Sequence, residues 1–172
     1  MLIVTNLTKF IKLMHYFNNM RKILRKKEIK ELKGLIKEEI LKKSKIEFFS
    51  DEDGEFILTD GEIALFKHKE WVLTLQAILK ESNEIKYKEV IVDAGAIKFV
   101  VNGADIMRPG ITKIDNEIEK DEVILIKEET HNKPLAFGIA LLSGEDMNTA
   151  TSGKVVKSLH YVGDNIWNRK KI

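Results

Sequence analysis

The sequence predicts an α+β protein of two small domains, an α+β N-terminal domain at residues 20–86 and a small β barrel at residues 87–172. Three observations support this prediction. Apolar residues recur at helical spacing near the start of the first domain, short apolar runs with turn residues between them follow, and glycine turns divide the runs of the second domain. With 172 residues, 44% of them apolar and 33% charged, the chain is long and apolar enough for two compact cores.

The composition also excludes several kinds of site. The sequence has no cysteine, so disulfides, thiolate zinc sites, iron–sulfur clusters and cysteine nucleophiles are ruled out, and a reducing, cytoplasmic setting fits. Lys9 and Lys12 interrupt the apolar start of the chain before it reaches membrane-spanning length, and it lacks the basic segment of a secretory signal. We therefore expect a cytoplasmic protein with no membrane partner.

Residues 1–19 allow two interpretations. They are an extension or gene-boundary error ahead of a natural start at Met20, or they form a genuine first strand or helix. The residues themselves leave both open.

The first domain begins with a predicted amphipathic helix over residues 25–43. Its apolar positions recur every three or four residues, and they are Leu24, Ile29, Leu32, Leu35, Ile36 and Ile40. Gly34 weakens this helix locally. Residues 20–45 hold 11 bases against four acids, which indicates either a solvated helix face or a surface for a polyanion. The candidate basic patch consists of Arg21, Lys22, Arg25, Lys26, Lys27, Lys30 and Lys33.

Short strands follow the helix, at residues 45–49, 55–59, 62–67 and 71–73. The acidic turns between them, at residues 51–54 and 60–61, contain Asp-Gly pairs, a strong signal for tight hairpins. A short helix is predicted at residues 75–80, and residues 81–84 form the predicted linker.

The second domain is predicted to be a barrel of short strands. Strands are predicted at residues 89–92, 123–126, 135–142, 154–161 and 165–167, with a helix at residues 94–101. Ser143 with Asp146 three residues later indicates the start of another helix. Glu128 and Glu129 are predicted to be a solvated loop pair. A barrel is one way in which so many short strands leave few open sheet edges.

Residues 92–111 contain several groups that suit an anion. Gly95 opens a helix whose first amides have no helical partners and can hold a phosphate, with Lys98 as a nearby charge. Gly103 suits the left-handed exit from that helix. Pro109 and Gly110 fit the centre of a type II turn, and Arg108 before it can grip a phosphate by two hydrogen bonds.

This segment resembles the PUA domain, which is named for pseudouridine synthases and archaeosine transglycosylases. The resemblance rests on the run Asp93-Ala94-Gly95-Ala96-Ile97-Lys98-Phe99-Val100-Val101-Asn102-Gly103-Ala104-Asp105-Ile106-Met107-Arg108-Pro109-Gly110-Ile111 and on the tail His160-Tyr161-Val162-Gly163-Asp164-Asn165-Ile166-Trp167. It is greatest with the malignant-T-cell-amplified-sequence translation factors and their archaeal relatives, in which a small α+β domain precedes the PUA domain. Archaeal members often begin with a basic segment like residues 21–27, which favours a start at Met20.

The resemblance implies a pseudo-barrel that binds RNA at the short helix, the glycine loop and neighbouring strands. Carried over to this sequence, the implied contacts are Ile97, Lys98, Phe99, Gly103, Ala104, Met107, Arg108, Pro109, Gly110, His160 and Tyr161. From their apolar character alone, Ile97 and Val100 are better candidates for the core, as are Tyr161 and Trp167. The eukaryotic factors typically have cysteine where this chain has Arg108, so the RNA partner cannot be transferred from them.

We therefore expect a non-catalytic protein that binds structured RNA, tRNA or rRNA, with the small ribosomal subunit and a protein partner as associates in initiation, re-initiation or recycling. Two alternatives stay open: a non-catalytic subunit of an RNA-modification complex, and a translation scaffold that acts mainly through protein contacts. No catalytic residues, cofactor or metal site are predicted, because the four histidines show no ligand spacing and no nucleotide-binding motif occurs. Residues 88–172 hold 12 bases and 13 acids, which argues against strong non-specific RNA binding by the barrel alone.

Overall fold

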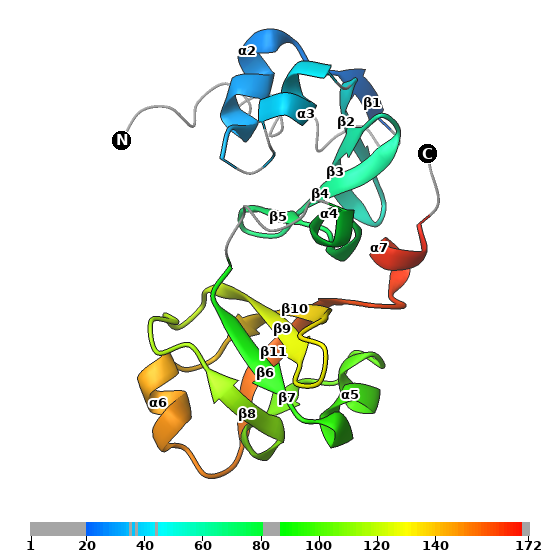
Figure 1. Cartoon of the computed structure of the whole chain (residues 1–172). Coiled ribbons are helices and arrows are strands. Elements are labelled where there is room, and N and C mark those ends of the chain that lie inside the picture. The colour runs from blue at the N-terminus through cyan, green and yellow to red at the C-terminus, as the bar shows by residue number, and fades with distance from the viewer. Residues whose placement is uncertain (1–19, 35, 37, 44, 81–86, 170–172) are drawn as a thin grey trace. The chain divides into compact units, whose positions relative to one another are not determined.

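The computed structural model describes residues 20–34, 36, 38–43, 45–80 and 87–169. The chain forms two compact units that divide between Ala77 and Ile78. The elements of each unit are labelled in Figure 1. The predicted linker at residues 81–84 and the segment at residues 1–19 lie outside the described residues.

An antiparallel meander forms the N-terminal unit, with the sheet order β1-β2-β3-β4-β5. Its strands are β1 (Met20–Ile23), β2 (Ile46–Asp51), β3 (Gly54–Thr59), β4 (Glu62–Lys67) and β5 (Trp71–Leu73), followed by helix α4 (Leu75–Lys80). Asp60 and Gly61 both have positive φ angles, of 51° and 83°, as a tight hairpin requires at its two central positions. The four strands predicted downstream of residue 44 are confirmed, and β1 is an additional strand.

The single helix predicted over residues 25–43 is wrong. In its place the chain forms α2 (Lys26–Ile29), the 3₁₀ turn η1 (Lys30–Leu32) and α3 (Glu38–Lys43). Gly34 explains the interruption, because its φ of 86° lies in the left-handed region, where a right-handed helix cannot continue. Leu32 and Ile36, on either side of Gly34, are both buried, so the apolar spacing still reports which residues face the core.

The C-terminal unit is a six-stranded, barrel-like sheet with the order β7-β11-β10-β9-β6-β8 (Figure 1). Its strands are β6 (Glu89–Val92), β7 (Ile106–Met107), β8 (Ile111–Ile114), β9 (Val123–Glu128), β10 (Pro134–Ala140) and β11 (Lys154–Tyr161). Its helical elements are α5 (Ala94–Val100), the 3₁₀ turn η2 (Arg108–Gly110), α6 (Gly144–Thr149) and α7 (Asn165–Asn168). The pair β6 and β9 is parallel, and all other pairs are antiparallel.

Alternate residues of these strands fill the barrel. The fully buried members of the core include Val90, Val92, Ile124, Ile126 and Val156. Such alternation is the burial pattern of a sheet with one face turned to a core.

The strand predicted at residues 165–167 is wrong, since these residues form α7. Asp164 stands at its N-cap and accepts a hydrogen bond from the Trp167 amide at 2.7 Å. This capping satisfies one of the first free amides of the helix and favours a helical turn over a strand. Among all the helices that the structure describes, none is long and apolar enough to cross a membrane.

Candidate RNA-binding surface

The first turn of α5 is already occupied by carboxylates. Asp93, the N-cap residue, accepts a hydrogen bond from the Ala96 amide at 2.8 Å, and Glu129 accepts one from the Ala94 amide at 3.1 Å. Two negative charges at this end would repel a phosphate. The predicted anion site on free amides at Gly95 is therefore wrong.

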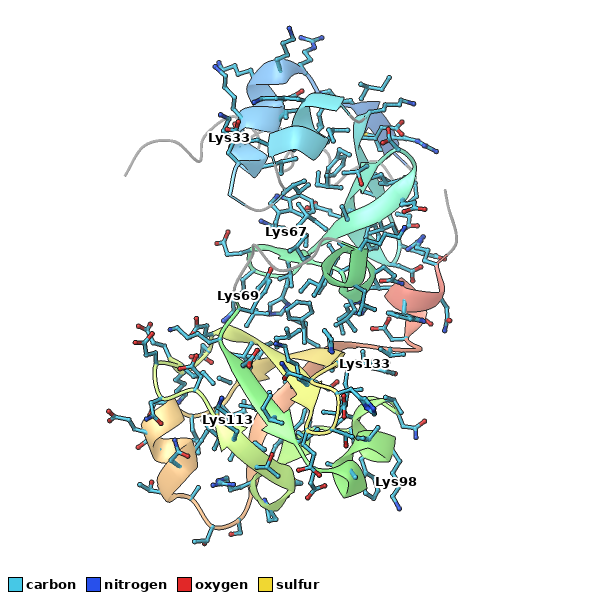
Figure 2. The ribbon with its side chains drawn as sticks, in the orientation of Figure 1. Lys33, Lys67, Lys69, Lys98, Lys113 and Lys133 are labelled. Atoms are coloured by element: carbon cyan, nitrogen blue, oxygen red, sulfur yellow. The ribbon has the colours of Figure 1, made fainter. Side chains whose placement is uncertain are left out.

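The exposed side of α5 carries Lys98 and Phe99. The Lys98 Nζ lies 4.8 Å from the centroid of the Phe99 ring, and 56% of Phe99 is exposed to solvent. Figure 2 shows Lys98 pointing away from the barrel. Val100 on the same helix is buried, and Ile97 packs against the core, so the core role predicted for these two residues holds.

Gly103 ends α5 in the left-handed conformation, with a φ of 78°, as predicted. A Cβ at this position would lie 2.6 Å from two ring atoms of Tyr161, closer than packed atoms tolerate. Tyr161 is half-buried and packs against the barrel core, which agrees with its predicted filling role. Ala104, exposed beside Gly103, donates from its amide to the Phe99 carbonyl at 3.0 Å. The loop is therefore a fixed surface next to Phe99.

The turn after β7 forms a second exposed edge. Met107 is 50% exposed and Pro109 is exposed as well. The type II turn predicted here is wrong: Arg108–Gly110 is a 3₁₀ turn, and Gly110 does not adopt a positive φ. Gly110 is needed for a different reason, because a Cβ there would lie 3.1 Å from the Ala96 Cβ of α5.

Arg108 is half-buried and bonded within the fold. Its Nε donates to the Met147 carbonyl at 2.6 Å and its Nη1 donates to the Ile111 carbonyl at 3.0 Å. The sequence predicts that the Arg108 guanidinium binds a phosphate by two hydrogen bonds, but in the structure two of its donors bind backbone carbonyls.

His160 cannot contact RNA from its observed position, because the residue has no exposed surface. Its Nδ1 lies 2.7 Å from the Asp164 Oδ2. Burial raises the pKa of the Asp164 carboxyl, but hydrogen bonds from His160 and from the Trp167 and Tyr161 amides together bring that pKa below its ordinary value. The predicted contact is wrong, and His160 serves instead to fix the chain entering α7.

Glutamates neutralise part of the predicted basic patch. Arg21 forms a two-pronged ion pair with the buried Glu47, at 3.0 Å from Nε and 2.9 Å from Nη2, and Lys45 lies 3.0 Å from the same carboxylate. The hydrogen bond from Arg21, helped by Lys45, lowers the pKa of Glu47 to about 2 against the opposing effect of burial. These contacts hold β1 against β2.

The remaining bases of the patch fall into two groups. Lys22 pairs with Glu28, and Lys33 pairs with Glu38. Among the described residues, four exposed bases of the patch form no ion pair, and they are Arg25, Lys26, Lys27 and Lys30.

Sequence reasoning missed the roles of Glu128 and Glu129. Glu128 is buried and accepts hydrogen bonds from the amides of Lys133, His131 and Thr130, which lower its pKa although burial opposes them. It thereby shapes the turn before β10, and Glu129 extends from that turn to α5. The prediction of a solvated pair is wrong for Glu128, which is buried, whereas Glu129 is exposed as predicted. The signal that could have identified Glu128 is an acid directly before a polar turn, a position from which a side chain can bond to the following amides.

The candidate surface therefore comprises the exposed side of α5, the Gly103 loop and η2. Within the described part of the chain, no group of three or more His, Asp or Glu side chains could hold a metal ion.

Comparison with known proteins identifies the family. The PUA domain matches residues 88–162. An uncharacterized protein of Methanocaldococcus jannaschii is 42% identical over 158 residues, which cover 87% of this chain and 96% of that protein. Translation machinery-associated protein 20 of Schizosaccharomyces pombe is 36% identical over 141 residues, which cover 79% of this chain and 78% of that protein.

A solved structure agrees with these relatives. The crystal structure of a hypothetical protein from Pyrococcus horikoshii matches with a TM-score of 0.70 and 32% identity, covering 86% of this chain and 98% of that one. The malignant T-cell-amplified sequence proteins are also among the relatives. The chain belongs to the PUA-domain family that includes translation machinery-associated protein 20 and the malignant T-cell-amplified sequence proteins.

Proposed function

We propose that this protein binds structured RNA at α5, the Gly103 loop and η2, and that it acts in translation without catalysing a reaction. The observation that carries the proposal is the exposed pair on α5, in which the Lys98 ammonium lies over the Phe99 ring. The exposed Phe99 ring offers apolar surface whose burial by a partner would contribute to binding. A cation beside it makes an anionic, aromatic partner the best match.

A nucleotide satisfies both groups at once. An unpaired base can stack on Phe99, and base stacking contributes about 1–3 kcal/mol per base. The Lys98 ammonium can then meet the adjoining phosphate as a point charge. Met107 at the end of β7 and Pro109 in η2 add apolar surface for the ribose or a second base. The position of the carboxylates at the other end of α5 directs the RNA to the Lys98 side.

The N-terminal unit supplies a second source of affinity. Its exposed bases Lys26, Lys27 and Lys30, which form no ion pair with any residue that the structure describes, suit the RNA backbone, which is bound mainly by charge. The C-terminal unit (the PUA unit) does not supply that attraction alone, because its residues 88–169 hold 10 bases and 13 acids.

The family gives the cellular setting. A relative named translation machinery-associated protein 20 favours tRNA or rRNA as the RNA, with the small ribosomal subunit as the larger assembly, during initiation, re-initiation or recycling. We propose recognition by shape and backbone, with base contacts confined to unpaired nucleotides such as an RNA end.

Gel-shift titrations test the proposal with tRNA that carries or lacks its terminal nucleotides. Lys98→Glu should weaken binding about 10-fold, and Phe99→Ala should weaken it by roughly 5- to 150-fold, in line with the loss of one stacked base. Lys120→Glu is the control, because Lys120 is also an exposed lysine but belongs to the β8–β9 loop and not to the candidate surface. Equal effects of Lys98→Glu and Lys120→Glu would reject the site.

Affinity purification then separates the functional settings. Recovery of small ribosomal subunits supports the translation role, and loss of that recovery in Phe99→Ala links it to this surface. Recovery of an RNA-modification enzyme in place of ribosomal subunits would point to the alternative of a non-catalytic subunit.

A further inference from the structure

Arg108 belongs to the η2 turn of the candidate surface, but its side chain is hydrogen-bonded within the fold. We propose that Arg108 is a positioning residue, which holds the η2 turn at the correct distance from α5 and does not itself bind a phosphate. This inference rests on the proposed function, since it concerns the shape of the same RNA-binding surface.

The bonding of the guanidinium is the first argument. Nε and Nη1 point to two carbonyls, of Met147 in α6 and of Ile111 at the start of β8, at 2.6 and 3.0 Å. Hydrogen bonds from a charged donor are about twice as strong as neutral ones. Turning the side chain outward to a phosphate would break both bonds and leave these carbonyls without their charged donor.

The position of η2 between two helices is the second argument. On the side of α5, the Gly110 carbonyl accepts a hydrogen bond from the Asp93 amide at 3.0 Å, and Gly110 packs closely against Ala96. On the other side, the Arg108 side chain connects η2 to α6. Arg108 thus completes a chain of contacts from α6 through η2 to α5.

This chain of contacts sets the geometry of the proposed surface. Lys98 and Phe99 belong to α5, whereas Met107 and Pro109 belong to the η2 side. A ligand that touches both sides depends on their spacing. An arginine suits the task because its planar, rigid fork holds the donors Nε and Nη1 at fixed positions, whereas a lysine offers one flexible ammonium.

The salt dependence of RNA binding distinguishes a positioning residue from a phosphate contact. Each phosphate contact contributes about −0.9 to the slope of log K against log salt concentration for a duplex, or about −0.7 for a single strand. Lys98→Gln should therefore make the slope shallower by roughly that amount and leave the melting temperature unchanged. Arg108→Gln should leave the slope unchanged, lower the affinity by a similar factor at every salt concentration, and lower the melting temperature.

Hydrogen exchange, measured with and without tRNA, tests the same inference. In the wild type, the Nε proton of Arg108 should exchange slowly with water and stay protected when tRNA is added. In Arg108→Lys, the Asp93 and Ile111 amides, which bond to Gly110 and Arg108 carbonyls, should exchange faster than in the wild type. This variant serves if Arg108→Gln fails to fold.

Two results would overturn the proposal. One is a shallower slope with an unchanged melting temperature in Arg108→Gln, and the other is a fast-exchanging Arg108 Nε proton that tRNA protects. A failure of the proposed function is distinct from either: wild-type protein would bind no RNA, while the exchange measurements would still show whether Arg108 holds η2.

Discussion

The basic segment of the N-terminal unit and the α5–η2 segment of the PUA unit differ in how many of their charges are available to a partner. Residues 20–45 hold 11 bases, yet Arg21, Lys22 and Lys33 of the predicted patch are paired with glutamates. The α5–η2 segment has only Lys98 and Arg108, and Lys98 is exposed and unpaired among the described residues. The number of bases in a sequence is therefore a poor measure of the charge that RNA would meet.

The two segments differ in their available charge because different groups hold them in place. In the N-terminal unit, ion pairs fasten β1 and α2, so part of the basic residues serves the fold. In the PUA unit, glycine packing and side-chain hydrogen bonds of Asp93, Glu129 and Arg108 to backbone groups hold the segment in place. Lys98 and Phe99 take no part in these contacts.

Gly103→Ala should destabilise the PUA unit, and we expect this effect to be the largest. The left-handed conformation costs a non-glycine residue about 1–2 kcal/mol, and overpacking against Tyr161 adds about 1–3 kcal/mol. We expect a loss of about 2–5 kcal/mol in the free energy of unfolding of the PUA unit, measured by urea denaturation.

Gly153→Ala is the matched control for that change. Gly153 also has a left-handed φ, of 91°, but nothing lies within 4 Å of its added Cβ. It should lose only the conformational part, about 1–2 kcal/mol. Equal losses in the two variants would show that the Tyr161 contact does not constrain Gly103.

Glu47→Gln should destabilise the N-terminal unit by weakening the contact between β1 and β2. It removes a buried carboxylate from Arg21 and Lys45, and hydrogen bonds to charged groups contribute about 1.5–3 kcal/mol. Because the pKa of Glu47 in the fold, about 2, is below its ordinary 4.5, its contribution is complete above about pH 4.5 and is lost as the pH falls toward 2.

Urea denaturation across this pH range measures the effect. The difference between wild type and Glu47→Gln should shrink as the pH falls from 4.5 toward 2. Glu52→Gln is the control, because Glu52 is an exposed acid in the adjacent turn between β2 and β3. A difference that stays constant with pH would disprove the role assigned to the ion pair.

Removal of the unpaired N-terminal bases should have the smallest effect. The variant Lys26→Gln/Lys27→Gln/Lys30→Gln should weaken RNA binding about 10-fold, or about 1.4 kcal/mol, and make the salt slope shallower. Lys42→Gln should change neither quantity, since Lys42 already pairs with Glu38. If both variants bind like the wild type, the N-terminal unit makes no contact with RNA.

Local signals in the sequence predicted much of the fold. Asp-Gly turns and apolar runs located β2 to β5 and β11, and Gly103 marked the end of α5. The errors share a cause, which is that a local pattern fits more than one structure. Helical spacing continued across Gly34, where the left-handed backbone ends the helix. Residues 165–167 looked like a strand because the capping role of Asp164 depends on its geometry and not on composition.

The site was harder to predict because its side chains form hydrogen bonds with residues that are distant in the sequence. Lys98 and Phe99 could be proposed from the PUA motif. The bonds of Arg108 to Met147 and of Glu129 to Ala94 span 39 and 35 residues, and no local pattern reports them. His160 was assigned to the surface for the same reason: its burial depends on the packing around β11 and α7.

The pairing of β7 with β11 has a consequence during synthesis of the chain. The surface that includes Lys98 and Met107 is complete in sequence at residue 110, but β7 finds its only described sheet neighbour in residues 154–161. Contacts so far apart form late, because a long loop must close before they contribute. We therefore expect the proposed RNA-binding surface to form only after almost the whole barrel has been synthesised.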